Sequence, residues 1–163
     1  MNLKSPKESM VEMTELVLPN DTNMLGNLLG GKLMHLVDIA GAMAAQRHSN
    51  RIVVTAAIDS VDFKSPVKAG EIIILKAKVT WVGRTSMEVA VEVFSEDYFT
   101  NRRKFTNKAY VTYVAVDSDG KPVEVPGLLV ETEEEKREYE AAAKRRSERL
   151  KRRCISENPG ISP

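Results

Sequence analysis

The segment Lys32–His48, KLMHLVDIAGAMAAQRH, decides the fold that we predict for this chain. It is apolar over most of its circumference, which is typical of an α-helix that is buried on most of its sides. Its longest apolar run, Leu33–Ala45, is interrupted by His35 and Asp38 and is too short and too polar to cross a bilayer. The segment therefore predicts one central helix inside a protein core.

After this helix the hydrophobic pattern changes to the alternation of strands. Ile52–Phe63 is rich in Val, Ile and Thr and predicts a long strand, and further strands are predicted at Glu71–Val82, Met87–Phe94 and Lys104–Asp117. Gly83, between two of these strands, suits the first central position of a type II′ hairpin turn. The apolar alternate positions of the second strand are predicted to face the core: Ile73, Leu75, Ala77, Val79 and Trp81.

The order of the predicted elements indicates the fold class. Met10–Leu18 is a weak strand, and it precedes the helix and a meander of about four strands. This order predicts an α+β fold in which a curved antiparallel sheet wraps around one long helix. Thr132–Arg153 has capping-box spacing at Thr132 and Glu135 and few apolar residues, so it predicts a surface helix. The expected division is a flexible N-terminus (1–9), the main domain (10–130), the charged helix (131–153) and a disordered tail (154–163).

Composition limits the classes of protein to which the chain can belong. A length of 163 residues and a hydrophobic fraction of 42% fit a single folded domain. The net charge of +1 gives no general attraction to nucleic acid or acidic lipid. Cys154 is the single cysteine, so no intrachain disulfide is possible. Met1–Lys7 has no signal-peptide pattern, and we expect a cytoplasmic protein without nucleic-acid or membrane partners.

Asp38 is the most informative polar residue, because every neighbour in Leu36–Ala45 is apolar or glycine. Burial of a carboxylate is costly unless the group is paired or hydrogen-bonded, so a reason for its presence is needed. Two interpretations are open at this point. Asp38 is either an acid–base group or a structural aspartate that hydrogen-bonds a neighbouring loop.

Three further features could bind a carbonyl or a phosphate. Gly30-Gly31 precede the helix, where unpaired N–H groups and the absence of side chains would suit an oxyanion hole. Asn23 could orient a water or the carbonyl. Gly83-Arg84-Thr85-Ser86 combines backbone N–H groups, hydroxyls and a guanidinium, which would suit a phosphate. Each of these three interpretations has an alternative, which is in order a glycine-rich entry turn, an asparagine that only stabilises a turn, and a plain hairpin.

Metal binding and nucleophilic catalysis find little support. The chain has only His35, His48 and the distant Cys154 as potential nitrogen and sulfur ligands, so no metal site is predicted. Neither histidine lies near a recognisable nucleophile motif. The helix dipole is a sufficient explanation for His48 at the end of the helix.

The run Pro19–Gly31 (PNDTNMLGNLLGG), together with Leu33–Ala45, resembles the hotdog-fold acyl-CoA thioesterases. The resemblance is to the YciA-type enzymes and to their tandem-domain relatives, the cytosolic acyl-CoA hydrolases. It covers about Leu16–Leu128, and Val82–Met87 (VGRTSM) and Arg103–Tyr110 (RKFTNKAY) also look like family segments. The spacing of asparagine, paired glycines and aspartate is its most specific part.

The resemblance implies a hydrolase that converts fatty acyl-CoA to free fatty acid and coenzyme A. Asp38 would be the general base or nucleophile, Asn23 would position the water or the carbonyl, and the Gly31 N–H would polarise the carbonyl. The family also implies dimers, often assembled as trimers of dimers, that place Asn23 and Asp38 of one site on different subunits. No cofactor is expected, because coenzyme A belongs to the substrate. The expected substrate contacts are Gly30, Val54, Thr55, Gly83, Arg84, Thr85 and Ser86.

Two alternative functions remain within the same fold. One is an acyl-CoA-binding protein without turnover, although a pure binder would need neither Asn23 nor Asp38. The other is a hydratase or dehydratase. Such enzymes generally pair a histidine with a carboxylate, whereas His35 lies beside Asp38 on the helix rather than in the Asn23 position.

Overall fold

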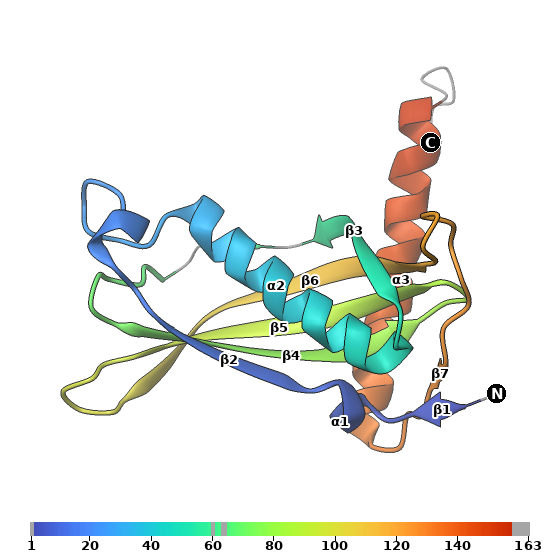
Figure 1. The fold of residues 1–163 in the computed structure, drawn as a ribbon, viewed down its shortest axis with the longest axis horizontal. Helices are drawn as coiled ribbons and strands as arrows, with labels where there is room; N and C mark the ends of the chain where they lie inside the picture. Colours follow the sequence, from blue (N-terminus) through green and yellow to red (C-terminus); the bar gives the residue numbers. More distant parts are fainter. Residues whose placement is uncertain (1, 60, 63–64, 158–163) are drawn as a thin grey trace.

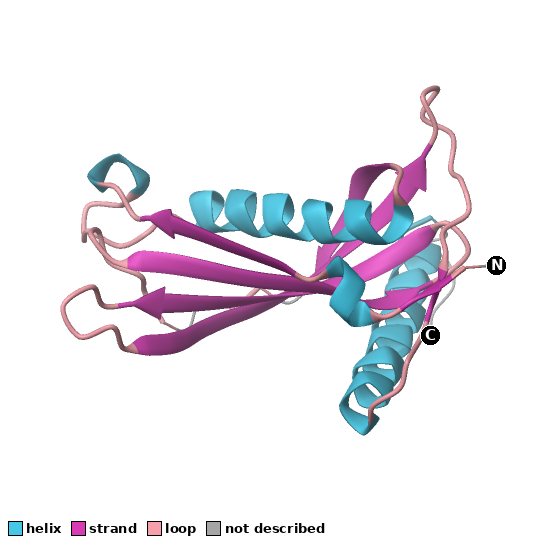
Figure 2. Cartoon of the chain, turned by 60° about the horizontal axis from the view of Figure 1, so that its bottom comes forward, coloured by secondary structure: helices cyan, strands magenta, loops and turns pink. Residues whose placement is uncertain are grey.

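The computed structural model describes residues 2–59, 61–62 and 65–157. A five-stranded antiparallel sheet with strand order β2-β4-β5-β6-β3 forms the centre of the molecule. Helix α2 crosses one face of this sheet and helix α3 crosses the other (Figures 1 and 2). The expected α+β fold, a curved antiparallel sheet around one long helix, is confirmed. Among the described residues, no helix is both long enough and apolar enough to cross a membrane.

Residues 1–9 were expected to be flexible, and the described part of this segment, residues 2–9, forms two short elements that are attached to the rest of the chain. Strand β1 pairs in parallel with β7, and the Val79 N–H donates a hydrogen bond to Ser9 Oγ at 2.9 Å. This contact fastens the N-terminal segment to the sheet. The elements in chain order are β1 Leu3–Lys4, α1 Pro6–Ser9, β2 Val11–Leu16, η1 Pro19–Asp21, α2 Gly30–Ser49, β3 Ile52–Asp59, β4 Ile72–Val82, β5 Ser86–Glu96, β6 Arg103–Val116, β7 Gly127–Leu128 and α3 Glu133–Glu157.

Helix α2 buries one side against the sheet and leaves the other side open. The expectation that it is buried on most sides therefore fails for a single chain, because Met34 and Ile39 are 38% and 39% exposed. The helix ends at Asn50, which adopts the left-handed conformation that asparagine tolerates better than most residues. The buried side of α2 consists of Leu33, Leu36, Val37, Ala40, Gly41, Ala44, Ala45, His48 and Ser49.

The four predicted strands after α2 are present, with two differences in detail. Strand β3 ends at Asp59, and part of its expected extension to Phe63 lies outside the described residues. In β4 an irregularity in the pairing lies between Val79 and Trp81. Trp81 consequently packs against Tyr139 of α3, with ring centres 6.5 Å apart. The prediction that Trp81 faces the core with the other alternate residues was wrong, because the bulge reverses the alternation.

The turn between β4 and β5 differs from the predicted type II′ turn. The Gly83 N–H donates to the Ser86 carbonyl at 2.8 Å, so Arg84 and Thr85 are the central residues. Gly83 does not have a positive φ. Glycine is needed instead for close packing, because a Cβ at this position would lie 2.9 Å from the Trp81 ring.

Helix α3 begins with the predicted capping box. The Glu135 N–H donates to Thr132 Oγ1 at 3.1 Å, and the Glu135 carboxylate accepts the Thr132 N–H at 3.1 Å. The helix is more than a surface helix, because it buries Ala142 and contacts the outer face of the sheet. It continues to Glu157, past Arg153 where we expected a tail to begin. Residues 158–163 of that tail lie outside the described residues.

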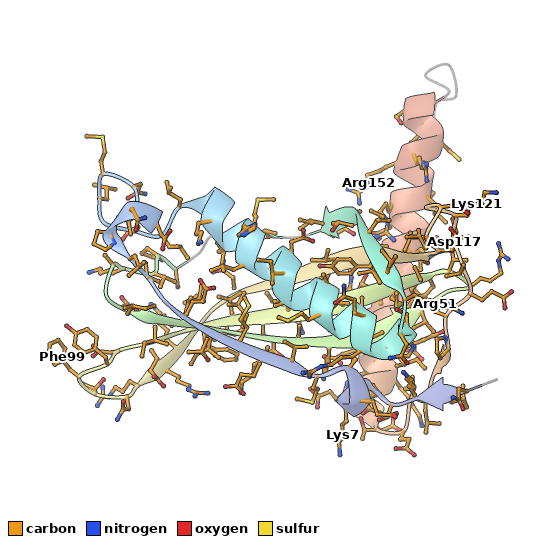
Figure 3. The ribbon with its side chains drawn as sticks, in the orientation of Figure 1. Lys7, Arg51, Phe99, Asp117, Lys121 and Arg152 are labelled. Carbon is orange, nitrogen blue, oxygen red and sulfur yellow. The ribbon has the colours of Figure 1, made fainter. Side chains whose placement is uncertain are left out.

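The two ends of the sheet carry different loops. Phe99, in the β5–β6 hairpin, lies at one end of the molecule, and Asp117 and Lys121 lie at the other (Figure 3). The loop that contains Asn23 is at the Phe99 end, because it follows Leu16 of β2, which pairs with Ile72. The turn between β4 and β5 is at the opposite end.

Candidate active site

Three side chains from three elements meet at the middle of α2. Thr55 Oγ1 of β3 donates a hydrogen bond to Asp38 Oδ1 at 2.7 Å. The Tyr113 hydroxyl of β6 donates to the Asp38 carbonyl oxygen at 2.7 Å and also lies 3.1 Å from Oδ1. Thr55 and Tyr113 are paired in register across β3 and β6. The pairing of these strands therefore places both hydroxyls under the same carboxylate.

The Asp38 carboxylate is only partly buried, although its neighbours along the helix are mostly apolar. Its hydrogen bonds go to two strand hydroxyls and not to a loop, as the structural interpretation had supposed. Both hydroxyls approach Oδ1, and within the described residues no hydrogen bond to Oδ2 is recorded. Oδ2 is therefore the oxygen that a water or a substrate can reach.

Asn23 and Gly30 line a cavity of about 260 Å³ at the N-terminal end of α2. The Asn23 side-chain oxygen accepts the backbone N–H groups of Leu25 and Asn27 at 2.9 and 3.2 Å. The Asn23 side-chain oxygen thus stabilises its own loop. Its side-chain amide nitrogen is the group that can donate a hydrogen bond to a ligand. Gly31 lies in the first turn of α2, and a Cβ there would meet no heavy atom within 4 Å. The N–H groups of a first helical turn have no partner within the helix, so they are available to an acceptor.

One chain does not bring Asn23 and Asp38 together. At about 1.5 Å per residue, Asp38 lies roughly 12 Å along the helix axis from Gly30. Asp38 is absent from the residues that line the cavity around Asn23. The single chain therefore presents two separate parts of the predicted site.

Comparison with known proteins identifies the family. Residues 25–98 match the model of the thioesterase superfamily. The chain is 45% identical to the acyl-CoA thioester hydrolase YkhA of Bacillus subtilis, over 93% of this chain and 88% of that protein. It is also 34% identical to the cytosolic acyl coenzyme A thioester hydrolase of Rattus norvegicus, over 81% of this chain and 35% of that protein.

The chain belongs to the hotdog-fold acyl-CoA thioesterases.

Solved structures agree with this assignment. The acyl-CoA hydrolase of Staphylococcus aureus, in complex with butyryl coenzyme A and coenzyme A, superimposes with a TM-score of 0.89 at 39% identity and covers 97% of this chain and 96% of that chain. A hexameric acyl-CoA thioesterase gives a TM-score of 0.90 at 46% identity, over 95% and 99% of the two chains. Solved variants of the Staphylococcus aureus protein replace an aspartate, a threonine and an asparagine by alanine.

The residues predicted to contact coenzyme A in this thioesterase are spread over two regions. Val54 lies beside Thr55 on β3 and is 48% exposed. Arg84 is exposed and forms an ion pair of 3.8 Å with Glu124, a type of surface pair that contributes little to stability. The Arg84 and Thr85 carbonyls accept hydrogen bonds from Val125 and Ala115, which fixes the backbone of the turn. Substrate contact at Gly83, Arg84, Thr85 and Ser86 stays a prediction.

The two histidines differ in their surroundings. His35 is exposed on α2, whereas His48 is buried and its Nε2 lies 2.8 Å from the Pro126 carbonyl oxygen. Burial lowers the pKa of His48, so the neutral ring donates Nε2–H to this carbonyl. The helix dipole would favour the charged ring, but burial outweighs it here. No cluster of potential metal ligands occurs in the part of the chain that the structure describes.

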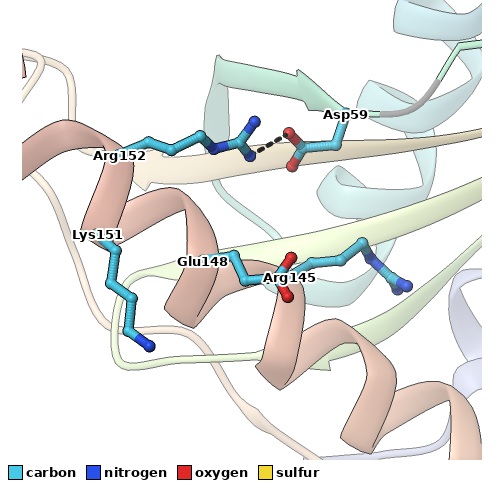
Figure 4. Close-up of a pocket in the computed structure, with 5 residues that line it drawn as sticks. All are labelled: Asp59, Arg145, Glu148, Lys151 and Arg152. Carbon is cyan, nitrogen blue, oxygen red and sulfur yellow. Dashed lines mark ion pairs between the residues drawn. The ribbon is translucent and has the colours of Figure 1, made fainter. Parts of the chain in front are cut away.

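A second cavity, of about 490 Å³, lies beside α3 and is lined by Asp59, Arg145, Glu148, Lys151 and Arg152. Figure 4 shows the guanidinium of Arg152 turned toward Asp59. Arg149 also pairs with Asp59, at 2.7 Å. These two ion pairs tie α3 to β3.

Sequence reasoning missed Tyr113 and did not connect Thr55 to the carboxylate, and substrate contact at Thr55 stays a prediction. Both lie far from Asp38 in the sequence, so no local spacing joins them to it. Gly41 was the residue in the sequence that could have indicated a close contact to this part of α2. Glycine inside a helix costs about 1 kcal/mol relative to alanine, and its use there often indicates that another group approaches closely.

Proposed function

We propose that this chain hydrolyses fatty acyl-CoA thioesters to a free fatty acid and coenzyme A, with Asp38 assisting the attack of water. The observation that carries this proposal is the arrangement of the carboxylate. Thr55 and Tyr113 hold Oδ1, and Oδ2 is left to accept a proton from water. A carboxylate positioned in this way is suited to general-base catalysis near neutral pH.

The Staphylococcus aureus hydrolase supports the choice of residues. The asparagine, aspartate and threonine replaced in its solved variants have the same spacing along the chain as Asn23, Asp38 and Thr55. The chain is 39% identical to that protein over nearly its whole length. We therefore infer that Asn23, Asp38 and Thr55 act together in one site.

The proposed reaction assigns a role to each group. Asp38 takes a proton from water as the water oxygen attacks the thioester carbonyl carbon. The Gly31 N–H stabilises the negative charge that develops on the carbonyl oxygen, and Asn23 orients the water or the carbonyl. The carbon–sulfur bond then breaks, and the proton held by Asp38 passes to the departing sulfur of coenzyme A. Gly30 and Val54 contact the acyl end of the substrate, while Arg84, Thr85 and Ser86 bind the coenzyme A phosphates.

We propose further that two copies complete each site, with Asn23 from one and Asp38 from the other. The separation of these residues along α2 within one chain supports this arrangement. Strand β3 supports it as well, since it pairs with β6 on one side only and carries Ile52 and Val54, which are 56% and 48% exposed. An unpaired apolar edge of this kind is suited to pairing with a second copy across a two-fold axis. Because a related thioesterase is hexameric, a trimer of dimers is the proposed assembly.

A cytoplasmic location is proposed on the basis of the cytosolic relative from Rattus norvegicus. Fractionation of cells that produce the protein tests it, and recovery in the membrane fraction would contradict it.

A thiol-release assay tests the activity and separates it from the two alternatives. The protein is mixed with palmitoyl-CoA and a thiol-trapping dye, and the hydrolase releases one thiol for each thioester cleaved. A binding protein would protect acyl-CoA without release of thiol. A hydratase would act on an enoyl-CoA and leave the thioester intact, so stoichiometric release of thiol is the outcome that only hydrolysis gives. A panel of acyl-CoA substrates then measures the preferred chain length.

A further inference from the structure

Tyr113 of β6 contacts the middle of α2 from the side of the sheet. Its side chain is fully buried, and its hydroxyl contacts both the backbone carbonyl and the carboxylate of Asp38. A hydroxyl in such a place needs a hydrogen-bond partner, since an unsatisfied buried donor is costly. Here both partners belong to a single residue, so Tyr113 fixes the backbone and the side chain of Asp38 at once.

Gly41 makes this contact possible. It lies one turn after Asp38 on α2, and a Cβ at this position would overlap the Tyr113 hydroxyl. Glycine is a poor residue for the interior of a helix, so its presence there disfavours the helix locally. The space that it leaves is filled by the tyrosine hydroxyl. The absence of a side chain at Gly41 of α2 therefore allows the close approach of Tyr113 from β6.

Tyr113 can act only as a donor to the carboxylate at working pH. Burial raises the pKa of Tyr113 far above its usual range, and the nearby Asp38 charge raises it further. The phenol thus stays protonated. The other hydroxyl on the Asp38 carboxylate is that of Thr55 on β3.

We propose that Tyr113 is the positioning residue of the Asp38 carboxylate. With Thr55 it holds Oδ1, and this leaves Oδ2 turned toward the substrate. The inference rests on the proposed function, because it assigns to Tyr113 a role in the same reaction. The hydroxyl of the fully buried Tyr113 contacts Asp38, so its effect is exerted through Asp38.

The test is Tyr113→Phe, which removes the hydroxyl and keeps the ring. The expected result is a loss in kcat of about tenfold or more with little change in KM, the scale of one hydrogen bond to a charged group. A loss in kcat without a matching rise in KM is a readout that a purely structural role would not give. Tyr110→Phe is the matched control, since Tyr110 lies on the same strand and packs under Arg145 of α3.

Two further variants separate positioning from a purely structural role. Gly41→Ala displaces the hydroxyl without removing it and should lower kcat as Tyr113→Phe does. In an Asp38→Asn background, Tyr113→Phe should cause no further loss, because the group through which it acts is absent. A folded Tyr113→Phe protein with wild-type kcat would overturn the inference. If Asp38→Asn alone keeps wild-type turnover, the proposed function fails as well. Wild-type kcat in Tyr113→Phe together with a loss in Asp38→Asn would overturn only the inference about Tyr113.

Discussion

Arg145→Met should destabilise the protein strongly although Arg145 lies far from Asp38. Glu88 faces the inner side of α3 and is 1% exposed. Arg145 Nη2 and Nε contact the two Glu88 carboxylate oxygens at 2.6 and 3.2 Å, and its guanidinium lies 3.6 Å from the centre of the Tyr110 ring. Removal of one partner from a buried ion pair leaves an uncompensated charge and costs about 3–5 kcal/mol. We expect Arg145→Met to lose free energy of unfolding on this scale.

Urea unfolding followed by Trp81 fluorescence measures this loss. Trp81 is the single tryptophan and packs against α3, so its emission reports the docking of that helix. All variants are compared at one protein concentration, because the stability of an oligomer depends on it. Arg137→Met is the matched control and should cost less than about 1 kcal/mol, since Arg137 is exposed on the same helix. The double variant Glu88→Leu/Arg145→Met should recover most of the loss. A loss below about 1 kcal/mol in Arg145→Met alone would refute the reasoning.

Three other predictions concern the site and its support. Thr55→Val should lower kcat by about tenfold or more, because Asp38 Oδ1 loses a donor, and wild-type kcat would contradict this role. Burial lowers the pKa of His48, so the unfolded chain takes up the proton first and stability falls as pH drops below about 6.5. His48→Gln should therefore lose less Tm than the wild type between about pH 7.5 and 5.5, and an equal loss would argue against it. Asn23→Ala and Asp38→Asn subunits, weakly active alone, should regain activity toward half of wild type per heterodimer when mixed, and no recovery in verified heterodimers would exclude a shared site.

The central helix and the strands could be predicted because each keeps a regular period. Lys32–His48 is apolar at helical spacing, and β4 and β5 have an apolar residue at every second position over most of their length. The bulge before Trp81 could not be predicted, since the alternation of side chains continues through it in the sequence. The role of α3 was missed for a related reason. Glu88 alternates with core residues and looks solvent-facing unless the helix that covers it is already known.

The candidate site was predictable only in part. Asp38 stood out because a carboxylate among apolar residues needs an explanation, and the resemblance to a known family supplied roles for Asn23 and Gly31. Thr55 was placed near the substrate but not on the carboxylate. Its pairing with Tyr113 depends on the register between β3 and β6, which is a property of the folded sheet. The hydrogen bonds that orient Asp38 therefore lie beyond what local sequence patterns indicate.

Turnover of Asp38→Asn tests the central claim most directly. Asparagine keeps the size of the side chain and an oxygen that can accept the Thr55 and Tyr113 hydroxyls, but it cannot take a proton from water. The protein should fold and assemble as the wild type does, and thiol release from palmitoyl-CoA should fall by at least about 10²-fold. Asp119→Asn, the same substitution in an exposed turn, should keep full activity. Near wild-type turnover in a well-folded Asp38→Asn protein would contradict the account.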